Sequence, residues 1–269
     1  MLKMARWVMA LGFLLSLTSA QVNAETKGRA SVNLYDQNTM SVLWYQKSAE
    51  AKALYYQGYY IGKLRLDEIL SKWPNNSLKP AVVLDIDETI LDNSPHLAWY
   101  VLHGKDKPFT WREWFSRGKA TALPGAVEFL QYADSKGVAI YYISNRKEAQ
   151  KEATMENLQS VGAPQVDPNH VLLKQPGEKG KETRRMKVAR THEIVLFFGD
   201  NLSDYSGFDQ LSVSGRLQAV EKSKEEFGKK LIVFPNPMYG DWEGAVYDYN
   251  YKKTDEEKAK LRKQYLEND

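Results

Sequence analysis

The chain has 269 residues and a formal net charge of +3, from 37 basic and 34 acidic side chains. This near balance lacks the strong basic excess of nucleic-acid-binding proteins, so no nucleic-acid partner is expected. The sequence contains no cysteine, which excludes disulfides, thiolate metal sites and a lipid anchor on a lipobox cysteine. We therefore expect no stable membrane anchor and a fold that relies on its apolar core.

The first 24 residues have the pattern of a secretory signal peptide. Lys3 and Arg6 precede an apolar run over residues 7–17, and residues 22–24 (VNA) match a small-residue cleavage site. The alternative, a membrane-spanning helix, needs about 20 apolar residues, and this run is shorter. We expect cleavage near Ala24 and export to the periplasm or the medium.

Residues 25–78 are expected to form an N-terminal helical segment. From about Thr39 to Leu70, apolar residues recur near helical spacing. Residues 73–76 (WPNN) favour a turn and should end this helix. Because the helix precedes the first strand, we expect it to pack outside the sheet.

Five apolar, largely β-branched segments predict strands that alternate with helices. We expect strands at residues 81–86, 138–143, 171–173, 194–198 and 231–234, and helices at 125–136, 147–161 and 181–190. Strand–helix–strand repetition indicates right-handed crossovers and a doubly wound parallel sheet, a Rossmann-like α/β fold. This core should cover residues 79–235.

Two aromatic-rich segments accompany this core, an insertion at residues 93–123 and a tail at 236–269. The insertion contains AWYVLHGKDKPFTWREWF and follows the first strand closely, so it should stand over the carboxyl end of the sheet. The tail ends in a charged segment, residues 254–269, which predicts a solvated helix with little core potential. With the N-terminal helix, these segments should form a small, mainly helical accessory region.

Paired aspartates follow two of the predicted strands. Asp85 and Asp87 occur in AVVLDIDETILDNS, and Asp200 and Asp204 occur in EIVLFFGDNLSDY. Ligands of open α/β sheets bind at the carboxyl ends of strands, so we expect the four carboxylates to lie together. Such an all-oxygen cluster suits Mg²⁺, and it leaves one carboxylate to attack and another to transfer a proton. For the first pattern alone, two solvated acids at a strand end are the alternative. For the second, the alternative is an ordinary turn, because Gly-Asp-Asn is a frequent turn sequence.

Further motifs follow in a fixed order. Ser144 and Asn145 end the second strand in ISNR, where they can cap the next helix and leave backbone N–H groups facing a phosphate. Taken together, DIDETILDNS, FTWREW, ISNR, GDNLSD and FPNPMYGDWE resemble the haloacid-dehalogenase-like (HAD) phosphatases. The combination is similar in particular to the class C non-specific acid phosphatases, typified by bacterial lipoprotein e, over about residues 39–247.

This resemblance implies an exported Mg²⁺-dependent phosphomonoesterase that acts on 5′-nucleotides and related mononucleotides and forms a homodimer. It implies that Asp85 is the nucleophile, which forms an aspartyl phosphate, and also a metal ligand. Asp87 is implied as the acid/base, with its backbone carbonyl on the metal. Asp200 is implied as a further metal ligand, and Asp204 as a residue that supports Asp200 without binding the metal directly.

The family also uses a hydroxyl residue that hydrogen-bonds the phosphoryl group, which corresponds to Ser144, and a lysine that neutralises the nucleophile. The stretch KQPGEKGKETRR offers Lys174, Lys179 and Lys181. We favour Lys181 because it opens a helical segment after a glycine-containing loop. Most other basic residues here, including Arg185, are expected on a solvated face.

The aromatic residues that sandwich the nucleobase in the family correspond to Trp111 and Tyr239. Packing between the insertion and the core is the alternative for both, and it is the expected role of Trp114 and Trp242. His96, which follows the first motif, is expected in a loop or on the surface.

Two other functions remain open from the sequence. A phosphotransferase would use the same aspartates to pass the phosphoryl group to an alcohol or a nucleoside. A non-catalytic nucleotide- or cofactor-binding protein would be expected to have lost an aspartate or the lysine, and none is lost here.

Overall fold

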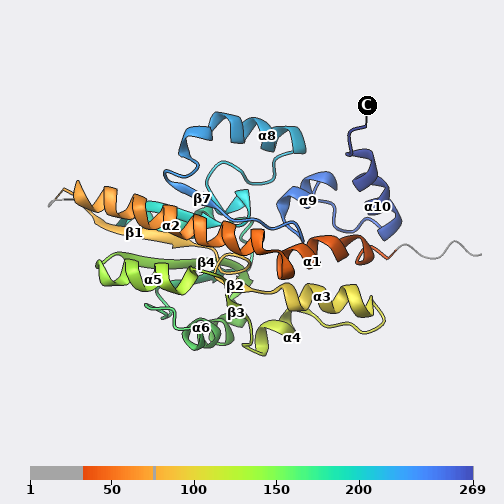
Figure 1. Cartoon of the computed structure of the whole chain (residues 1–269), viewed down its shortest axis with the longest axis horizontal. Coiled ribbons are helices and arrows are strands. Elements are labelled where there is room, and N and C mark those ends of the chain that lie inside the picture. Colours follow the sequence, from red (N-terminus) through yellow and green to blue (C-terminus); the bar gives the residue numbers. More distant parts are fainter. Residues whose placement is uncertain (1–32, 75–76, 269) are drawn as a thin grey trace, which may run out of the picture. The chain divides into compact units, whose positions relative to one another are not determined.

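The computed structural model describes residues 33–74 and 77–268, so the predicted signal peptide lies outside the described residues. A five-stranded sheet has the order β5-β4-β1-β6-β7, and β2 and β3 form a separate two-stranded sheet (Figure 1). The strands are β1 (Lys79–Leu84), β2 (Leu91–Asp92), β3 (Thr121–Ala122), β4 (Ala139–Lys147), β5 (Val171–Lys174), β6 (His192–Gly199) and β7 (Leu231–Val233). The helices are α1 (Thr39–Lys47), α2 (Ala49–Ser71), α3 (Ser94–His103), α4 (Trp111–Ser116), α5 (Ala126–Ser135), α6 (Lys151–Ser160), α7 (Glu182–Ala189), α8 (Val213–Lys222), α9 (Asp241–Val246) and α10 (Asp255–Gln264).

Every strand pair of the large sheet is parallel, which confirms the predicted fold class. β1 is the central strand, and its Leu84 lies opposite Tyr142 of β4 and Phe198 of β6. All five predicted strands form, although β4 continues to Lys147, beyond the predicted end. The continuous apolar sequence of β1 fits this central position, because a strand covered on both faces has no solvated side.

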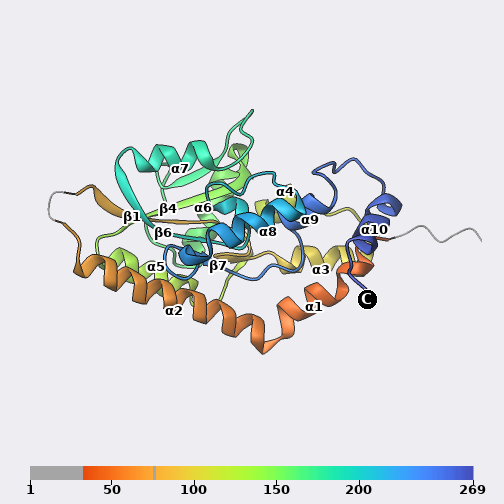
Figure 2. The same cartoon turned by 90° about the horizontal axis from the view of Figure 1, so that it is seen from above.

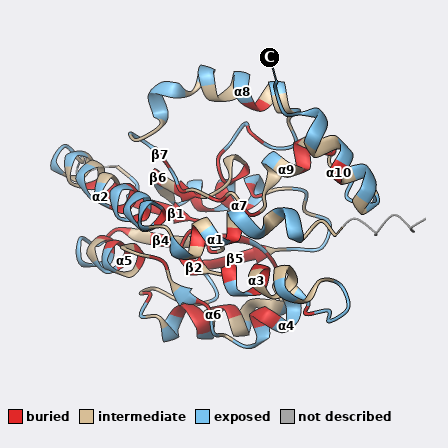
Figure 3. Cartoon of the chain, turned by 45° about the vertical axis from the view of Figure 1, so that its right-hand side comes forward, coloured by how far each residue is buried: buried red, intermediate tan, exposed pale blue. Residues whose placement is uncertain are grey.

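Helices cover both faces of the sheet. Val82 and Leu84 of β1 belong to the core on the α2 and α5 side, whereas Ala81 and Val83 pack with Val188 of α7 on the other side. Figure 2 shows the sheet between these two layers. Buried residues concentrate on the strands and on the helix faces turned toward them (Figure 3). Within residues 33–74 and 77–268, every helix falls short of the length or the hydrophobicity of a transmembrane span.

The N-terminal helical segment is two helices, not the single helix that was predicted. Ser48 has an extended ψ of 138°, which ends α1, and its hydroxyl accepts the N–H of Ala51 at 3.0 Å to cap α2. Serine is a strong N-cap, and here the cap prevails over continuous helical periodicity. The longer helix, α2, then lies on the sheet through Gly58 and Gly62, whose added Cβ atoms would come within 2.5 Å of Phe234 and 2.6 Å of Phe198.

The aromatic insertion begins and ends at one short antiparallel pair. Leu91 of β2 pairs with Ala122 of β3, so the chain leaves and returns at neighbouring points, with α3 and α4 between them. α4 starts with a capping box in which Thr110 and Glu113 each accept the other's backbone N–H. The insertion therefore stands on a two-stranded base next to the end of β1.

The C-terminal part differs from the prediction in two respects. α8 forms after Ser212, an N-cap residue in a region where no helix or strand was predicted. α10 is docked rather than free. Its Ala259 is buried, and Arg262 donates to the Tyr247 hydroxyl at 2.6 Å and to Gln37 Oε1 at 2.9 Å. An arginine can anchor a charged helix in this way because its planar fork reaches several acceptors at once.

Candidate active site

One cavity of about 680 Å³ contains all the predicted site residues. They come from the ends of β1, β4 and β6, from the start of α7, and from the insertion and the tail. The nine residues are Asp85, Asp87, Trp111, Ser144, Asn145, Lys181, Asp200, Asp204 and Tyr239. The cavity therefore joins the carboxyl edge of the sheet to both aromatic segments.

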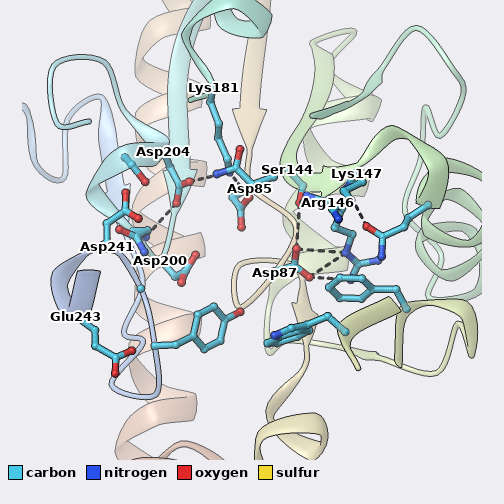
Figure 4. A pocket seen from close by; sticks show the side chains of 18 of the residues that line it. Asp85, Asp87, Ser144, Arg146, Lys147, Lys181, Asp200, Asp204, Asp241 and Glu243 are labelled. Carbon is cyan, nitrogen blue, oxygen red and sulfur yellow. Dashed lines mark hydrogen bonds and ion pairs between the residues drawn. The ribbon is translucent and has the colours of Figure 1, made fainter. Parts of the chain in front are cut away.

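Asp85 directly follows β1 and is buried beside an ammonium group. Its backbone N–H donates to Phe198 O at 2.9 Å, which continues the pairing of β1 with β6. Its carboxylate forms a buried ion pair with Lys181, and the same ammonium lies 2.7 Å from Asp204 Oδ1 (Figure 4). Of the three candidate lysines, Lys181 is the one that lines the cavity.

The burial of these groups changes their protonation equilibria. Burial, together with the charges of Asp204 and Asp87, raises the pKa of Asp85 to about 7, although Lys181 opposes the shift. Burial and the neighbouring carboxylates also raise the pKa of Asp200. For Lys181, burial alone would lower the pKa, but Asp204 and Asp85 more than offset it and the pKa rises. Carboxylates crowded in this way favour a proton or another cation between them.

The acidic cluster fits a divalent cation. Carboxylate oxygens of Asp85, Asp200 and Asp204 all lie within 4.8 Å of one another. Lys181 offsets one of their three negative charges, which leaves two for a cation, and every donor is a hard oxygen ligand of the kind that Mg²⁺ prefers. Asp200 is oriented by Asn236, whose Nδ2 donates to Oδ2 at 2.7 Å.

Gly199 permits the close approach of Asp204 to this cluster. An added Cβ at Gly199 would lie 2.5 Å from the Cβ of Asp204 and 2.7 Å from its Cγ. A side chain at position 199 would therefore clash with Asp204, which explains the glycine before the second aspartate pair.

Asp87 points away from the cluster, toward a separate set of donors. Arg146 holds it through Nη2 at 2.8 Å and Nε at 3.0 Å, both to Oδ1. Ser144 Oγ donates to its Oδ2 at 3.0 Å, and Asn93 Nδ2 donates to Oδ1 at 2.8 Å. The Arg146 side chain is almost fully buried, with its guanidinium over the Phe115 ring at 3.9 Å.

Arg146 belongs to the ISNR motif, but no role was predicted for it. The sequence did contain a signal for such a role, because Arg146 lies at the end of a predicted strand, two residues after the predicted phosphate ligand Ser144.

Arg184 and Arg185 of α7 are also buried, and this corrects the expectation for Arg185. It is 3% exposed and donates to the backbone carbonyls of Ser203 and Asp204 at 3.2 and 2.9 Å. Arg184 donates to Asn145 Oδ1 at 3.0 Å. The charge pattern of α7 suggested a solvated face, but these guanidinium groups satisfy oxygen atoms around the site that would otherwise be buried without donors.

Trp111 and Tyr239 meet across the cavity. Their ring centroids are 5.6 Å apart with an interplanar angle of 62°, an edge-to-face arrangement. A base between the two rings would therefore require one of them to turn. Trp114 is buried and donates from its indole nitrogen to Asn93 Oδ1 at 2.7 Å, in keeping with a packing role. Trp242 is 42% exposed, and its indole nitrogen donates to Asn236 O at 3.1 Å.

His96 is buried in α3, which corrects its expected place on the surface. It is 1% exposed, and its ring centroid lies 4.1 Å from that of Trp111. Among the described residues, neither ring nitrogen has a hydrogen-bond partner. This burial lowers the pKa of His96 to about 4. The apolar face of α3 turns His96 inward, where its ring packs as an aromatic residue.

Comparisons with known proteins agree with this geometry. The family model of the HAD superfamily, subfamily IIIB (acid phosphatase), matches residues 7–242. The structure of the class C acid phosphatase from Bacillus anthracis is 58% identical with a TM-score of 0.86, and the match covers 88% of this chain and 100% of that chain. The same enzyme with tungstate bound is 59% identical over the same shares, also with a TM-score of 0.86.

More distant relatives include plant proteins. Acid phosphatase 1 of Solanum lycopersicum is 27% identical over 166 residues, which cover 58% of this chain and 57% of that protein. Vegetative storage protein 1 of Arabidopsis thaliana is 28% identical over 165 residues, which cover 58% and 54%. The chain thus spans little more than half the length of these curated relatives.

The strand-end carboxylates, the buried lysine and these matches lead to one assignment: the chain belongs to subfamily IIIB of the HAD superfamily, the acid phosphatases, and its predicted resemblance to class C is confirmed.

Proposed function

We propose that this protein is a Mg²⁺-dependent acid phosphatase that hydrolyses small phosphomonoesters, with 5′-nucleotides and related mononucleotides as its substrates. One observation carries the proposal. Asp85 lies in the cavity beside Lys181 and within the acidic cluster, while Asp87 faces the same cavity from another set of donors. Two carboxylates in such different environments can take two different chemical roles.

In the first step, a carboxylate oxygen of Asp85 attacks phosphorus. The Asp85–phosphorus bond forms as the bond from phosphorus to the ester oxygen breaks, and Asp87 gives its proton to the departing alkoxide. Lys181 favours the ionised form of Asp85 and offsets charge on the phosphoryl oxygens. Ser144, which donates to Asp87, lines the same cavity, and we assign its hydroxyl to donation to the bound phosphoryl group.

In the second step, water cleaves the aspartyl phosphate. Asp87, now ionised, takes a proton from the water as its oxygen attacks phosphorus, and the bond to Asp85 breaks to regenerate the carboxylate. Arg146 and Asn93 hold Asp87 in place for both transfers. One carboxylate thus serves as acid and then as base.

The metal would be held by carboxylate oxygens of Asp85 and Asp200 and by the backbone carbonyl of Asp87, with Asp204 supporting the site. Bound there, Mg²⁺ supplies positive charge that offsets the charge of the phosphoryl oxygens. The Bacillus anthracis enzyme has been solved with tungstate, an oxyanion of the same general kind as phosphate. That structure supports an oxyanion site in this family.

We assign Trp111 and Tyr239 to the nucleobase. Aromatic rings at the mouth of a phosphate site can stack on any base, which suits an enzyme with several nucleotide substrates. Asn145 lies beside Ser144 on the cavity wall, and we assign it to substrate binding.

A phosphate-release screen tests the proposed function. The purified protein should release phosphate from nucleoside 5′-monophosphates faster than from sugar phosphates in the presence of Mg²⁺. Adding excess glycerol or nucleoside measures the fraction of phosphoryl groups that pass to an alcohol, and a predominant transfer product would identify a phosphotransferase. A folded protein that binds nucleotides without any turnover would instead support the non-catalytic function.

Export and a homodimer are also part of the proposal. The leader sequence over residues 1–24 supports export, and N-terminal sequencing of the secreted protein should begin at Glu25. The resemblance to class C enzymes supports the dimer, and sedimentation equilibrium of the mature protein would measure its mass directly.

A further inference from the structure

Glu88 is a buried carboxyl group that the proposed chemistry does not use. It follows Asp87 in the turn after β1, is fully buried and has a φ of +54°. Its Oε1 accepts the N–H of Asn93 at 2.7 Å, and its Oε2 accepts the hydroxyl of Tyr239. A non-glycine residue keeps this left-handed backbone conformation only where its surroundings fix it. Glu88 is therefore held in one position by the turn and by both hydrogen bonds.

Asn93 connects Glu88 to Asp87. It is fully buried, and its Oδ1 accepts the indole N–H of Trp114 at 2.7 Å. Because an indole nitrogen can only donate, this contact fixes which side of the amide carries the oxygen. The amide nitrogen then faces the two carboxylates, at 2.8 Å from Asp87 Oδ1 and 3.4 Å from Glu88 Oε2.

A continuous hydrogen-bonded path thus runs from the Tyr239 hydroxyl through Glu88 and Asn93 to Asp87. The path connects Tyr239, which lines the cavity, to Asp87, the carboxylate that is proposed as the general acid. Hydrogen bonds in a buried network support one another, so the loss of one member is felt at the others.

We propose that Glu88 is a positioning residue that fixes the Asp87 carboxylate through Asn93. The Tyr239 hydroxyl then contributes to protonation of the leaving group, in addition to any contact between its ring and a base. This inference rests on the proposed function, because it requires Asp87 to be the acid.

The test uses Tyr239→Phe, which keeps the aromatic ring and removes only the hydroxyl. The kcat for a nucleoside 5′-monophosphate, which has a poor leaving group, should fall on the order of tenfold, a part of the 10²–10⁴-fold effect that general acid catalysis supplies. The kcat for p-nitrophenyl phosphate, whose leaving group needs little protonation, should fall less than about twofold. The KM for the nucleotide should change little, because the ring is retained.

A double-mutant cycle with Glu88→Gln identifies the path. If the hydroxyl acts through Glu88, adding Tyr239→Phe to Glu88→Gln should reduce the kcat for the nucleotide little further. Tyr142→Phe is the matched control, because this buried tyrosine donates to Pro164 O at 2.6 Å and does not line the cavity. It should leave the ratio of the two kcat values at the wild-type level.

Two outcomes would overturn the role of Glu88. One is an unchanged ratio of the two kcat values in folded Tyr239→Phe. The other is a loss of kcat in the double variant that equals the product of the losses in the two single variants. Absence of phosphate release by the wild-type protein from either substrate would instead contradict the proposed function itself.

Discussion

Asp85 and Asp87 are separated by one residue, yet they lie in different electrostatic surroundings. Asp85 is buried against Lys181, and its pKa is raised to about 7 by burial and the neighbouring carboxylates. Asp87 is held by Arg146, Ser144 and Asn93. In an extended segment, side chains two positions apart point to the same face, so both carboxylates reach one cavity, and the turn after β1 gives them different partners. The two roles in the proposed mechanism follow from this difference in partners.

The substitution Asp85→Asn should abolish turnover while the fold remains intact. An amide neither attacks phosphorus nor binds a cation as a carboxylate does, so kcat should fall by several orders of magnitude, as for other essential nucleophiles. Steady-state phosphate release and far-UV circular dichroism are the measurements. Appreciable activity in a folded Asp85→Asn protein would contradict the aspartyl-phosphate mechanism.

His96 should lower the stability of the protein in acid. Its folded pKa is about 4, below the value of about 6.5 for an unfolded histidine. As the pH falls from about 6.5 to about 4, His96 binds a proton in the unfolded chain but stays neutral in the folded chain. The free energy of unfolding therefore decreases over this window.

The variant His96→Phe retains an aromatic ring and removes the titrating group. Urea unfolding at pH 7 and pH 4.5 should show a smaller loss of stability for His96→Phe than for the wild type. Equal losses in the two proteins would show that His96 does not contribute to the acid sensitivity.

At the scale of elements, α2 approaches the sheet through its glycines. The Cβ of an alanine at position 62 would lie 2.6 Å from the Phe198 ring, which is itself buried in the core. Helix backbone and aromatic rings are therefore in direct contact, and the spacing of α2 from β6 depends on the absence of a side chain.

Gly62→Ala should destabilise the protein. Alanine gains about 1 kcal/mol over glycine in a helix, but overpacking a core costs about 1–3 kcal/mol, so we expect a net loss. Chemical denaturation measures the change in the free energy of unfolding. Gly215→Ala in α8 is the control, because its added Cβ would come no closer than 3.2 Å to the Ser212 hydroxyl and should cost far less than the clash at Gly62. A stability gain at Gly62 would mean that the aromatic rings can move aside.

The insertion and the tail should determine substrate preference. Trp111 and Tyr239 belong to these two segments and meet at the cavity. Stacking contributes on the order of 1–3 kcal/mol per aromatic residue, and glycerol phosphate has no ring on which this energy can act. The double change Trp111→Ala with Tyr239→Ala should raise KM for nucleoside monophosphates sharply and affect glycerol phosphate far less. If kcat/KM falls by the same factor for both substrates, the two aromatics only hold the segments in place.

At the scale of the whole molecule, the acidic cluster joins two strands and the start of α7. Its three carboxylates carry two negative charges that Lys181 does not offset, so a bound cation should stabilise the folded state as well as permit turnover.

Chelation with EDTA should inactivate the enzyme, and Mg²⁺ should restore the activity and raise Tm. Zn²⁺ should substitute poorly, because the site lacks the nitrogen and sulfur ligands that it favours. Asp200→Asn is the matched variant, and its Tm should respond less to Mg²⁺ than that of the wild type. Full activity after exhaustive chelation would exclude the metal role of Asp200.

The parallel α/β fold, its strands and the four aspartates at their ends could all be predicted from the sequence. These features depend on local periodicity and on turn residues, which act over a few positions. The partners of the side chains could not be predicted in this way. The burial of Arg185, the contact of Arg146 with Asp87 and the docking of α10 join residues that are distant in sequence. Glu88 and Tyr239 illustrate this, since they lie 151 positions apart and share a hydrogen bond. Only tertiary packing, with β1 between β4 and β6 and the tail lining the cavity, brings such residues together. Buried polar groups then take the partners that the surrounding elements offer.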